Sequence, residues 1–342
     1  MKQTLVVFLI FAVLAVVTGC ARLKTQPCAE TASAGSAMTC QVAGYDDRSY
    51  DVLVPDGYDG EPVPVLLVLH GGGGNRYGAL RGACPDADLD DPECLHLRAL
   101  ARGFAVVAPD GTKGAVGNFR TWNSGGGVDN YRCTSGLACE KDVDDVGYVR
   151  DLIADVAGRL NVDRARVFAT GISNGGAMSH RLGCELSDEV AAIAPIGGAM
   201  QLTVSHECAP ERAVPVLHVH GSEDPCWRFE GGVPECSSWI VGQPGKEHVP
   251  VRRSMDEWAA INSCEGEPVE TSLPDTTEDG TTSVLLTWPG CDADTELLRI
   301  DGGGHTWPRG WQYLSEDTIG RVPQDWGNDL LLDWFEAHPM PQ

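Results

Sequence analysis

The feature that most constrains the fold is the stretch "RVFATGISNGGAMSHRLGC", residues 166–184, in which an apolar run passes into a helical pattern through a glycine-rich turn. Ser173 stands in this turn within the pattern Gly-x-Ser-x-Gly, and Gly176 follows it. Such a turn either caps a helix with a serine or exposes that serine as a nucleophile at the top of a sheet. The second interpretation requires a histidine, an acid and an anion-stabilising loop elsewhere in the chain.

Short apolar runs and helical patterns alternate along the rest of the chain. The expected strands are residues 63–70, 104–108, 165–170, 190–195, 214–220 and 295–300. The expected helices are residues 142–160, 174–186, 252–262 and 325–336. This alternation predicts an α/β fold with a doubly wound, mostly parallel sheet, helices on both faces and a site at the carboxyl ends of the strands. The long polar segments 71–99 and 111–141 are expected to form the rim of that site.

Two further strand ends supply an acid and a base in the chain order of an α/β-hydrolase, serine then acid then histidine. Strand 214–220 leads into "GSEDP", and we select Asp224 as the acid, with Glu223 as its close rival. Strand 295–300 leads into three glycines and then His305, which has room to swing toward Ser173 and is selected as the base. A carboxylate that orients a histidine is what activates a serine hydroxyl.

The loop "HGGGGN", residues 70–75, follows strand 63–69 and supplies the last part of the predicted site. Glycines let backbone N–H groups approach a developing oxyanion without obstruction by side chains. We expect the N–H groups of Gly72 and Asn174 to be the donors, with Gly73 beside the first. A phosphate-binding loop would continue with Lys-Ser or Lys-Thr, which is missing here, so no nucleotide cofactor is expected.

The N-terminus has the pattern of an export signal. Lys2 precedes thirteen apolar residues, 5–17, too few to span a bilayer but typical of a signal peptide. "VTGC" then resembles a bacterial lipobox, which predicts lipidation of Cys20; an ordinary signal peptide is the alternative. The expected organisation is a signal peptide at 1–19, a lipidated N-terminus and flexible tether at 20–37, and one esterase-type α/β-hydrolase domain at 38–342.

Cysteine content and charge agree with export. Apart from Cys20, twelve cysteines remain, an even number in a chain expected to enter an oxidising compartment. The simplest pairing joins sequence neighbours: Cys28/Cys40, Cys84/Cys94, Cys133/Cys139, Cys184/Cys208, Cys226/Cys236 and Cys264/Cys291. The chain has no Cys-x-x-Cys spacing, so no metal site is expected. The net charge is −24, and it becomes −25 without residues 1–19, which contain one lysine and no acid; this argues against nucleic acid as a partner.

The motifs together resemble the extracellular polyhydroxybutyrate depolymerase and feruloyl esterase group of α/β-hydrolases. The likeness extends over roughly residues 41–334 and is carried by "LHGGGGN" (69–75), "TWN" (121–123), "DVDDVGYVRDLI" (142–153), "HVHGSEDP" (218–225) and "GGGHTWP" (302–308), besides the serine segment. The resemblance implies the same roles for Ser173, Asp224 and His305, and disulfides for Cys184/Cys208 and Cys264/Cys291. The chain departs from many relatives by carrying Gly72 where they have cysteine.

The leading prediction is an exported, monomeric serine esterase that forms an acyl-enzyme and contacts the membrane only through its lipid anchor. The alternatives are a serine peptidase, an acyltransferase, and a surface lipoprotein that binds without catalysis. The ester could be a hydroxyalkanoate polymer, a feruloyl or acetyl group on polysaccharide, or a smaller molecule. Trp122 and Trp307 are the candidate substrate-binding residues, with Trp227 and Trp239 as weaker ones.

Overall fold

The computed structural model describes residues 23–114, 118–133, 136–236 and 247–341. Cys20, the expected signal peptide and Trp239 lie outside these residues.

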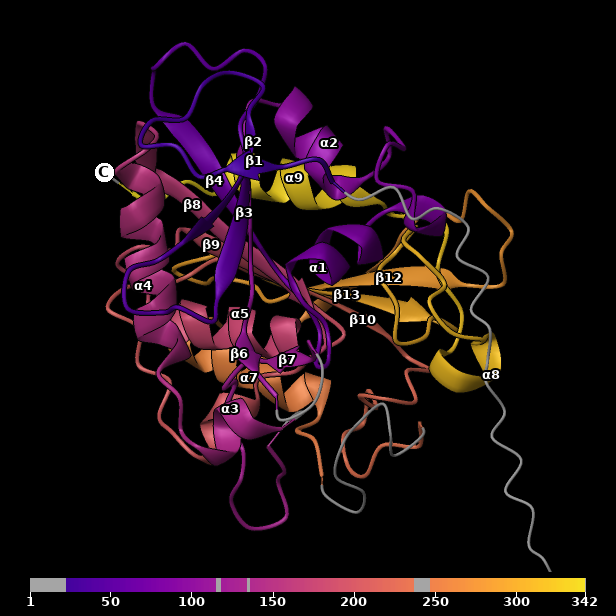
Figure 1. The fold of residues 1–342 in the computed structure, drawn as a ribbon. Coiled ribbons are helices and arrows are strands. Elements are labelled where there is room, and N and C mark those ends of the chain that lie inside the picture. The colour runs from indigo at the N-terminus through magenta and orange to yellow at the C-terminus, as the bar shows by residue number, and fades with distance from the viewer. Residues whose placement is uncertain (1–22, 115–117, 134–135, 237–246, 342) are drawn as a thin grey trace, which may run out of the picture.

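A single mixed sheet of eleven strands forms the centre of the molecule, in the order β1-β2-β3-β5-β4-β8-β9-β10-β13-β12-β11 (Figure 1). The strands are β1 (Gln26–Pro27), β2 (Ala37–Gln41), β3 (Ser49–Leu53), β4 (Val63–Leu69), β5 (Ala105–Pro109), β8 (Val162–Ile172), β9 (Ala192–Ile196), β10 (Val216–Gly221), β11 (Val269–Ser272), β12 (Thr282–Thr287) and β13 (Thr295–Asp301). A separate hairpin pairs β6 (Thr112–Lys113) with β7 (Arg120–Thr121). The run from β5 to β13 is parallel throughout, as the apolar segments predicted.

The central strands are apolar on both faces because helices cover both. Every residue of β4, β5 and β9 is buried, and Leu67 of β4 pairs with Val107 on one side and Ala169 on the other. A strand that must be buried on two faces needs such a continuous apolar run. The flanking pairs β2–β3 and β12–β11 are antiparallel additions that the alternation of strands and helices did not predict.

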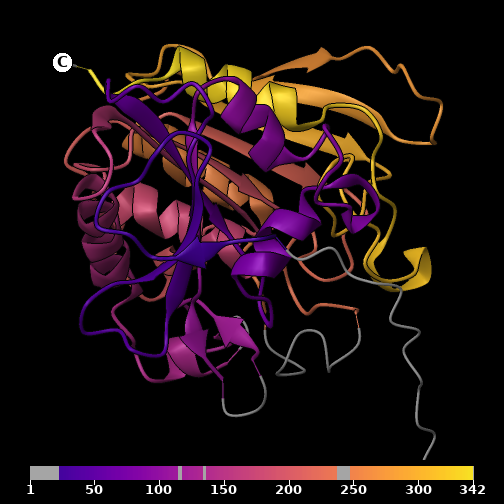
Figure 2. The ribbon, with the colours of Figure 1, turned by 45° about the horizontal axis from the view of Figure 1, so that its top comes forward.

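Helices occupy both faces of the sheet (Figures 1 and 2). They are α1 (Arg76–Gly82), α2 (Leu95–Ala101), α3 (Leu137–Glu140), α4 (Asp145–Ala157), α5 (Asn174–Glu185), α7 (Val251–Ile261), α8 (Glu316–Ile319) and α9 (Asn328–Ala337), with single 3₁₀ turns at Pro85–Ala87 and Gln201–Val204. Side chains of α4, α5 and α7 pack into one apolar core and those of α1, α2 and α9 into another. The predicted doubly wound α/β architecture is therefore confirmed.

Part of the segment expected to be a flexible tether belongs instead to the folded domain. Gln26 and Pro27 form β1, which pairs in parallel with the edge strand β2. Ala32 is buried, and its N–H donates to the carbonyl of Arg159 at 3.1 Å. The disulfide Cys28–Cys40 joins this segment to β2. The composition, rich in Ala, Ser and Thr, suggested a tether, but an unpaired strand edge and one disulfide are enough to fix it.

Six disulfides join sequence neighbours, as predicted: Cys28–Cys40, Cys84–Cys94, Cys133–Cys139, Cys184–Cys208, Cys226–Cys236 and Cys264–Cys291. The loops that they close are short, with sequence separations from 6 to 27 residues. Several of them constrain connections around the carboxyl ends of the strands, which agrees with the expected disulfide-stapled loops.

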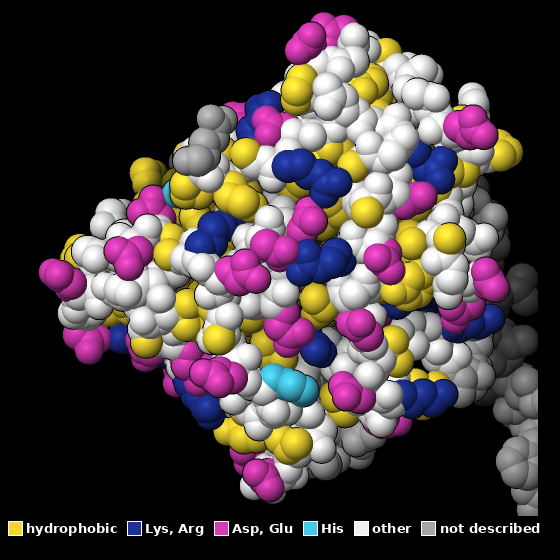
Figure 3. All heavy atoms as spheres, turned by 90° about the vertical axis from the view of Figure 1, so that its left-hand side faces the viewer, with side chains coloured by type: hydrophobic (Ala, Val, Ile, Leu, Met, Phe, Trp, Pro, Cys, Tyr) yellow, Lys and Arg dark blue, Asp and Glu magenta, His cyan; other side chains and the backbone are white. Residues whose placement is uncertain are grey.

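Opposite charges are interspersed on the face shown in Figure 3, although the chain carries a strong negative charge. Ion pairs of the described residues include Arg150 of α4 with Asp188 at 2.6 Å and Arg164 with Glu189 at 2.7 Å. Among the described residues, no helix combines the length and the apolar character that crossing a membrane would need.

Candidate active site

Ser173 occupies a strained turn between β8 and α5. Its φ is 59° and its ψ −121°, in a region that L-residues with a side chain rarely adopt. The backbone N–H of Ser173 donates to the carbonyl of Ile196 at 2.8 Å, which ties the turn to the neighbouring strand β9. This is the geometry of a nucleophile elbow, and it distinguishes Ser173 from an ordinary helix cap, whose side chain would bond to the helix.

Gly175 lets α5 begin close against β4. A Cβ atom at this position would lie 2.4 Å from the carbonyl oxygen of Leu69 and 2.6 Å from that of His70. Any side chain would therefore push the helix away from the sheet and carry Ser173 with it. The position of the second glycine in the Gly-x-Ser-x-Gly pattern therefore has no room for a side chain.

The glycine loop after β4 lies beside Ser173 and is held from behind by His70. Nε2 of His70 accepts the N–H of Gly111 at 3.0 Å, so Nδ1 carries the ring hydrogen and donates to the carbonyl of Gly71 at 2.8 Å. Burial lowers the pKa of His70 to about 4, and the ring is neutral.

The backbone N–H groups of this loop differ in what they bond. That of Gly73 donates to the carbonyl of Arg120, and that of Gly74 donates to the carbonyl of Gly71, both at 2.9 Å. Within the described part of the chain, no group accepts a hydrogen bond from the N–H of Gly72, which lines the pocket with Ser173. The pattern favours Gly72 over Gly73 as a donor to a ligand.

Asn174, the residue after the serine, is clamped by the segment that contains Trp122. The N–H of Trp122 donates to Oδ1 of Asn174 at 2.7 Å, and Nδ2 of Asn174 donates back to the carbonyl of Trp122 at 3.0 Å. The indole Nε1 of Trp122 donates to the carbonyl of His70 at 3.0 Å. These contacts join the glycine loop and the start of α5 into one unit.

The expectation that Trp122 binds substrate is therefore wrong. Trp122 is fully buried and does not belong to the pocket wall, because its ring packs behind the glycine loop against His70. A tryptophan in a polar segment predicted to form the rim invited the wrong inference. Trp307, the second candidate, does line the pocket.

Asp224 and His305 are brought together at the carboxyl ends of β10 and β13. Nδ1 of His305 donates to Oδ2 of Asp224 at 2.6 Å. The other oxygen, Oδ1, accepts the backbone N–H groups of Cys226 at 2.8 Å and of Trp227 at 2.7 Å. Glu223, the rival acid, is exposed.

Asp224 is ionised although it is buried. Burial raises its pKa, but the charge of His305 and hydrogen bonds from His220 and His305 outweigh this effect and hold the pKa well below its usual range. Nε2 of His220 lies 3.3 Å from Oδ2. His220 is a functional candidate to which no sequence motif pointed.

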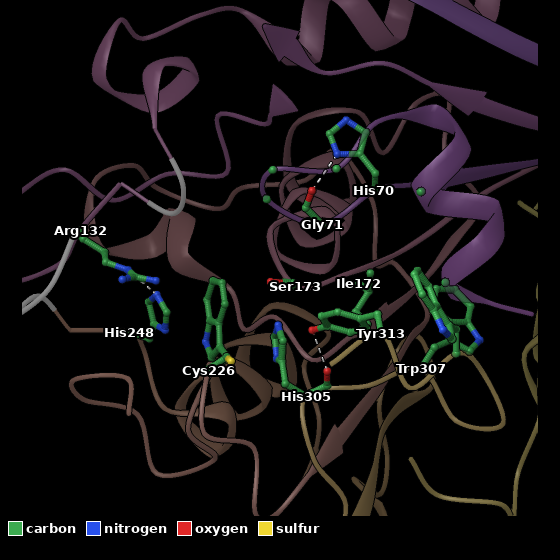
Figure 4. A pocket seen from close by; sticks show the side chains of 17 residues that line it. His70, Gly71, Arg132, Ile172, Ser173, Cys226, His248, His305, Trp307 and Tyr313 are labelled. Atoms are coloured by element: carbon green, nitrogen blue, oxygen red, sulfur yellow. Dashed lines mark hydrogen bonds between the residues drawn. The ribbon is translucent and has the colours of Figure 1, made fainter. Parts of the chain in front are cut away.

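One cavity of about 270 Å³ is lined by Ser173, His305 and the glycine loop (Figure 4). Ser173 and His305 face it from the middle of its wall, with Trp307 and Tyr313 toward one end and Arg132 and His248 toward the other. No hydrogen bond joins the described residues Ser173 and His305; catalytic contacts of this kind often shorten only when substrate binds. Its remaining lining residues are His70, Gly71, Gly72, Gly73, Gly74, Gly78, Gly82, Ile172, Cys226, Trp227 and Trp311.

Aromatic and basic side chains give the cavity two different ends. Arg81 stacks over Trp311 at 4.7 Å, and the hydroxyl of Tyr313 donates to the backbone carbonyl of His305 at 3.1 Å. At the opposite end, Nε of Arg132 donates to Nε2 of His248 at 2.7 Å. Burial lowers the pKa of His248 well below its ordinary value, and its ring stacks on Trp227.

Known proteins with similar sequences are esterases. The chain is 28% identical to feruloyl esterase B of Piromyces equi over 279 residues, which are 80% of this chain but 46% of that protein. It is 27% identical to feruloyl esterase C of Emericella nidulans over 80% of this chain and 82% of that protein. A bifunctional acetylxylan esterase/xylanase of Neocallimastix patriciarum is 24% identical over 75% of this chain and 31% of its own length. No family model matches the chain.

Solved structures show the same fold at low sequence identity. The acetyl xylan esterase from Aspergillus awamori superposes with a TM-score of 0.55 at 13% identity, covering 88% of this chain and 99% of that one. The native form of pOPH gives 0.52 at 16% identity, covering 92% and 90%. The fold is thus that of an α/β-hydrolase. The relatives named feruloyl esterases agree with the resemblance of the chain's motifs to the feruloyl esterase and polyhydroxybutyrate depolymerase group.

Proposed function

We propose that this chain is a serine esterase that hydrolyses carboxylic esters through Ser173, His305 and Asp224. The observation that carries the proposal is the 2.6 Å bond from Nδ1 of His305 to the buried Asp224, because His305 lines the same cavity as Ser173. The strained backbone of Ser173 and the names of the sequence relatives support it.

In the proposed reaction, Oγ of Ser173 attacks the ester carbonyl while Nε2 of His305 takes its proton. The carbonyl oxygen becomes an oxyanion that accepts the N–H groups of Gly72 and Asn174. The tetrahedral intermediate collapses, His305 returns the proton to the departing alcohol, and the acyl group remains on Ser173. Water then attacks the acyl-enzyme with His305 as base, which releases the carboxylic acid and restores Ser173.

The geometry divides this work among the three side chains. Asp224 fixes the His305 ring with Nδ1 protonated, which leaves Nε2 as the proton acceptor. Since Asp224 is ionised, it also stabilises the imidazolium that forms during each step.

The substrate class that we infer is an ester with an aromatic acyl group. Trp227, Trp307, Trp311 and Tyr313 line the cavity that holds Ser173, and flat aromatic walls favour a planar conjugated group. Two relatives are named feruloyl esterases. Initial rates on methyl ferulate, a short-chain acetate and a 3-hydroxybutyrate oligomer, measured at equal concentrations, test the choice. Preference for either aliphatic ester would reject the aromatic class while leaving the esterase proposal standing.

The esterase proposal itself is tested by Ser173→Ala. Turnover of a chromogenic short-chain ester should fall by roughly three to six powers of ten, because only the attacking oxygen is removed. A fluorophosphonate probe should label the wild-type protein at Ser173 and leave the variant unlabelled. Residual activity above a few per cent, or labelling at another serine, would contradict the assignment.

We also propose that the protein is exported and anchored through a lipid on Cys20, acting as a monomer without a cofactor. The six disulfides support an oxidising compartment. Cys20→Ser should move the protein from the detergent phase to the aqueous phase of a phase-separation assay. A variant that still partitions into detergent would show that another feature holds it.

A further inference from the structure

Three buried histidines form a line of hydrogen bonds that ends at the carbonyl of Trp227, beside Asp224. Nε2 of His180 lies 3.0 Å from Nδ1 of His218, and Nε2 of His218 lies 2.9 Å from Nδ1 of His220. Nε2 of His220 lies 2.7 Å from the carbonyl of Trp227 and 3.3 Å from Oδ2 of Asp224. We name His180, His218 and His220 the imidazole chain.

The backbone brings these rings together by simple periodicity. His218 and His220 are two residues apart on β10, so both point to the same face of the sheet. His180 reaches them from α5, which packs on that face. The rings are nearly coplanar, with interplanar angles of 21° and 14°, so each N–H can point at the next nitrogen.

A tryptophan at the far end determines the direction of every hydrogen bond. Nε1 of Trp258, on α7, lies 2.9 Å from Nδ1 of His180, and an indole nitrogen can only donate. His180 must therefore accept at Nδ1 and carry its hydrogen on Nε2. His218 then accepts at Nδ1 from His180 and carries its hydrogen on Nε2, and His220 does the same with respect to His218. The Nε2–H of His220 therefore points to the carbonyl of Trp227 and to Asp224.

All three rings are neutral for the same geometric reason. A second proton on any of them would place two hydrogens in one nitrogen–nitrogen gap, or one against the indole N–H. Burial agrees with this, because it lowers the pKa of His180 to about 3 and that of His218 well below its ordinary value. In the described part of the chain, the ionisable groups in polar contact with these rings are one another and Asp224, which in turn accepts the N–H of His305.

We propose that the imidazole chain acts as a one-directional hydrogen-bond relay that holds Asp224 in place for His305, with His220 as the positioning residue. Asp224 accepts three hydrogen bonds, two at Oδ1 and one from His305 at Oδ2, and Nε2 of His220 adds a 3.3 Å contact to Oδ2, so the carboxylate cannot rotate without losing one of these contacts. The N–H of His220 fixes the carbonyl of Trp227, whose ring lines the cavity. Aligned N–H···N bonds polarise one another, which strengthens the last bond in the line.

The tautomers can be read directly from the wild-type protein labelled with ¹⁵N-histidine. Long-range ¹H–¹⁵N spectra at neutral pH should show His180, His218 and His220 each protonated at Nε2 alone, and the rings of His180 and His218 should not titrate between about pH 5 and 8. Assignment comes from the cross-peaks lost in single His→Gln variants. A ring protonated at Nδ1, or charged in this range, would overturn the relay. This measurement does not depend on activity, so it remains decisive even if the proposed esterase function fails.

The positioning role rests on the proposed function and is tested by His220→Leu against His220→Gln. Leu removes the donor, whereas the Gln amide can still donate near the position of Nε2. With a chromogenic ester, His220→Leu should lower kcat roughly 10- to 100-fold with KM changed less than about twofold, and His220→Gln should recover most of the loss. His96→Leu, which removes a buried histidine outside the pocket wall, is the matched control and should leave kcat unchanged. Equal losses of kcat in the Leu and Gln variants, or a loss matched by His96→Leu, would show that the role is only structural.

Discussion

Ser173 and Asp224 both stand at strand ends of the same sheet, but the chain fixes them in different ways. Around Ser173 the backbone does the positioning: a strained turn, a helix start that only glycine allows, and a glycine loop on the same cavity wall. Around Asp224 side chains do it, through His305, His220 and the two rings behind it. We therefore expect the half around Ser173, the proposed nucleophile half, to be sensitive to added volume, and the half around Asp224 and His305, the proposed acid–base half, to be sensitive to the loss of a single donor or charge.

Positioning by backbone and positioning by side chains are separated by several variants, and we expect the largest effect from Asp224→Asn. The amide keeps the volume and can keep some hydrogen bonds, but it loses the charge that stabilises the His305 imidazolium. Turnover of an ester should fall by roughly two to four powers of ten. Glu223→Gln, on the adjacent exposed residue, is the control and should cost far less. Steady-state kinetics of both variants on one ester decide the assignment, and a large loss for Glu223→Gln with near-normal Asp224→Asn would reverse it.

A smaller effect is expected on the free energy of unfolding. Each half contains a buried neutral histidine, which makes this free energy depend on pH. The pKa is lowered by burial to about 4 for His70 in the nucleophile half and to about 3 for His180 in the acid–base half. The unfolded chain takes up these protons near pH 6.5, whereas the folded chain does not. Each group should thus lower the free energy of unfolding by about 1.4 kcal/mol per pH unit as the pH falls from about 6.5 toward its folded pKa, with no such loss above 6.5.

Urea unfolding of the wild type between about pH 7 and 4 measures this slope. His70→Gln and His180→Gln should each reduce it by about one proton. If the pH dependence of the free energy of unfolding is unchanged in both variants, burial does not hold these rings neutral. Buried neutral histidines would then not contribute to the stability of either half.

The backbone conformation around Ser173 could be predicted from the sequence because its determinants are local. Gly-x-Ser-x-Gly and the loop "HGGGGN" each specify a backbone conformation within a few residues of the group that they position. Asp224 and His305 followed from the chain order of strands, since parallel strands bring their carboxyl ends to one edge. The parallel part of the sheet was equally predictable from its continuous apolar runs.

The supporting contacts could not be predicted, because each joins segments that are distant in the chain. His-x-His at 218–220 shows that two imidazoles share a face of β10, but not that His180, 38 residues earlier, lies across from them. Trp258 is a further 78 residues from His180. Trp122 was misassigned for the same reason: its partners His70 and Asn174 each lie 52 residues away, and only the fold shows that its ring is behind the loop rather than on the rim. Composition likewise could not show that β1 adds to the sheet edge.

The smallest expected effect tests whether the two halves are independent. Trp122 and Trp258 each contribute one indole N–H, the first to the carbonyl of His70 at 3.0 Å and the second to Nδ1 of His180 at 2.9 Å. Phenylalanine removes the donor and keeps an aromatic ring in each place. Loss of one such buried hydrogen bond is worth about 1 kcal/mol, so each single variant should lower kcat about fivefold, with KM nearly unchanged.

The double variant Trp122→Phe/Trp258→Phe should then lose about 25-fold, the product of the two single losses, because the residues share no hydrogen-bond partner. Melting temperatures of all four proteins, measured in parallel, identify any loss that reflects unfolding. A double variant much closer to either single variant would mean that the indoles support one common element. The half around Ser173 and the half around Asp224 would then be one coupled unit, and the cavity wall that Ser173 and His305 share would be the place where they are joined.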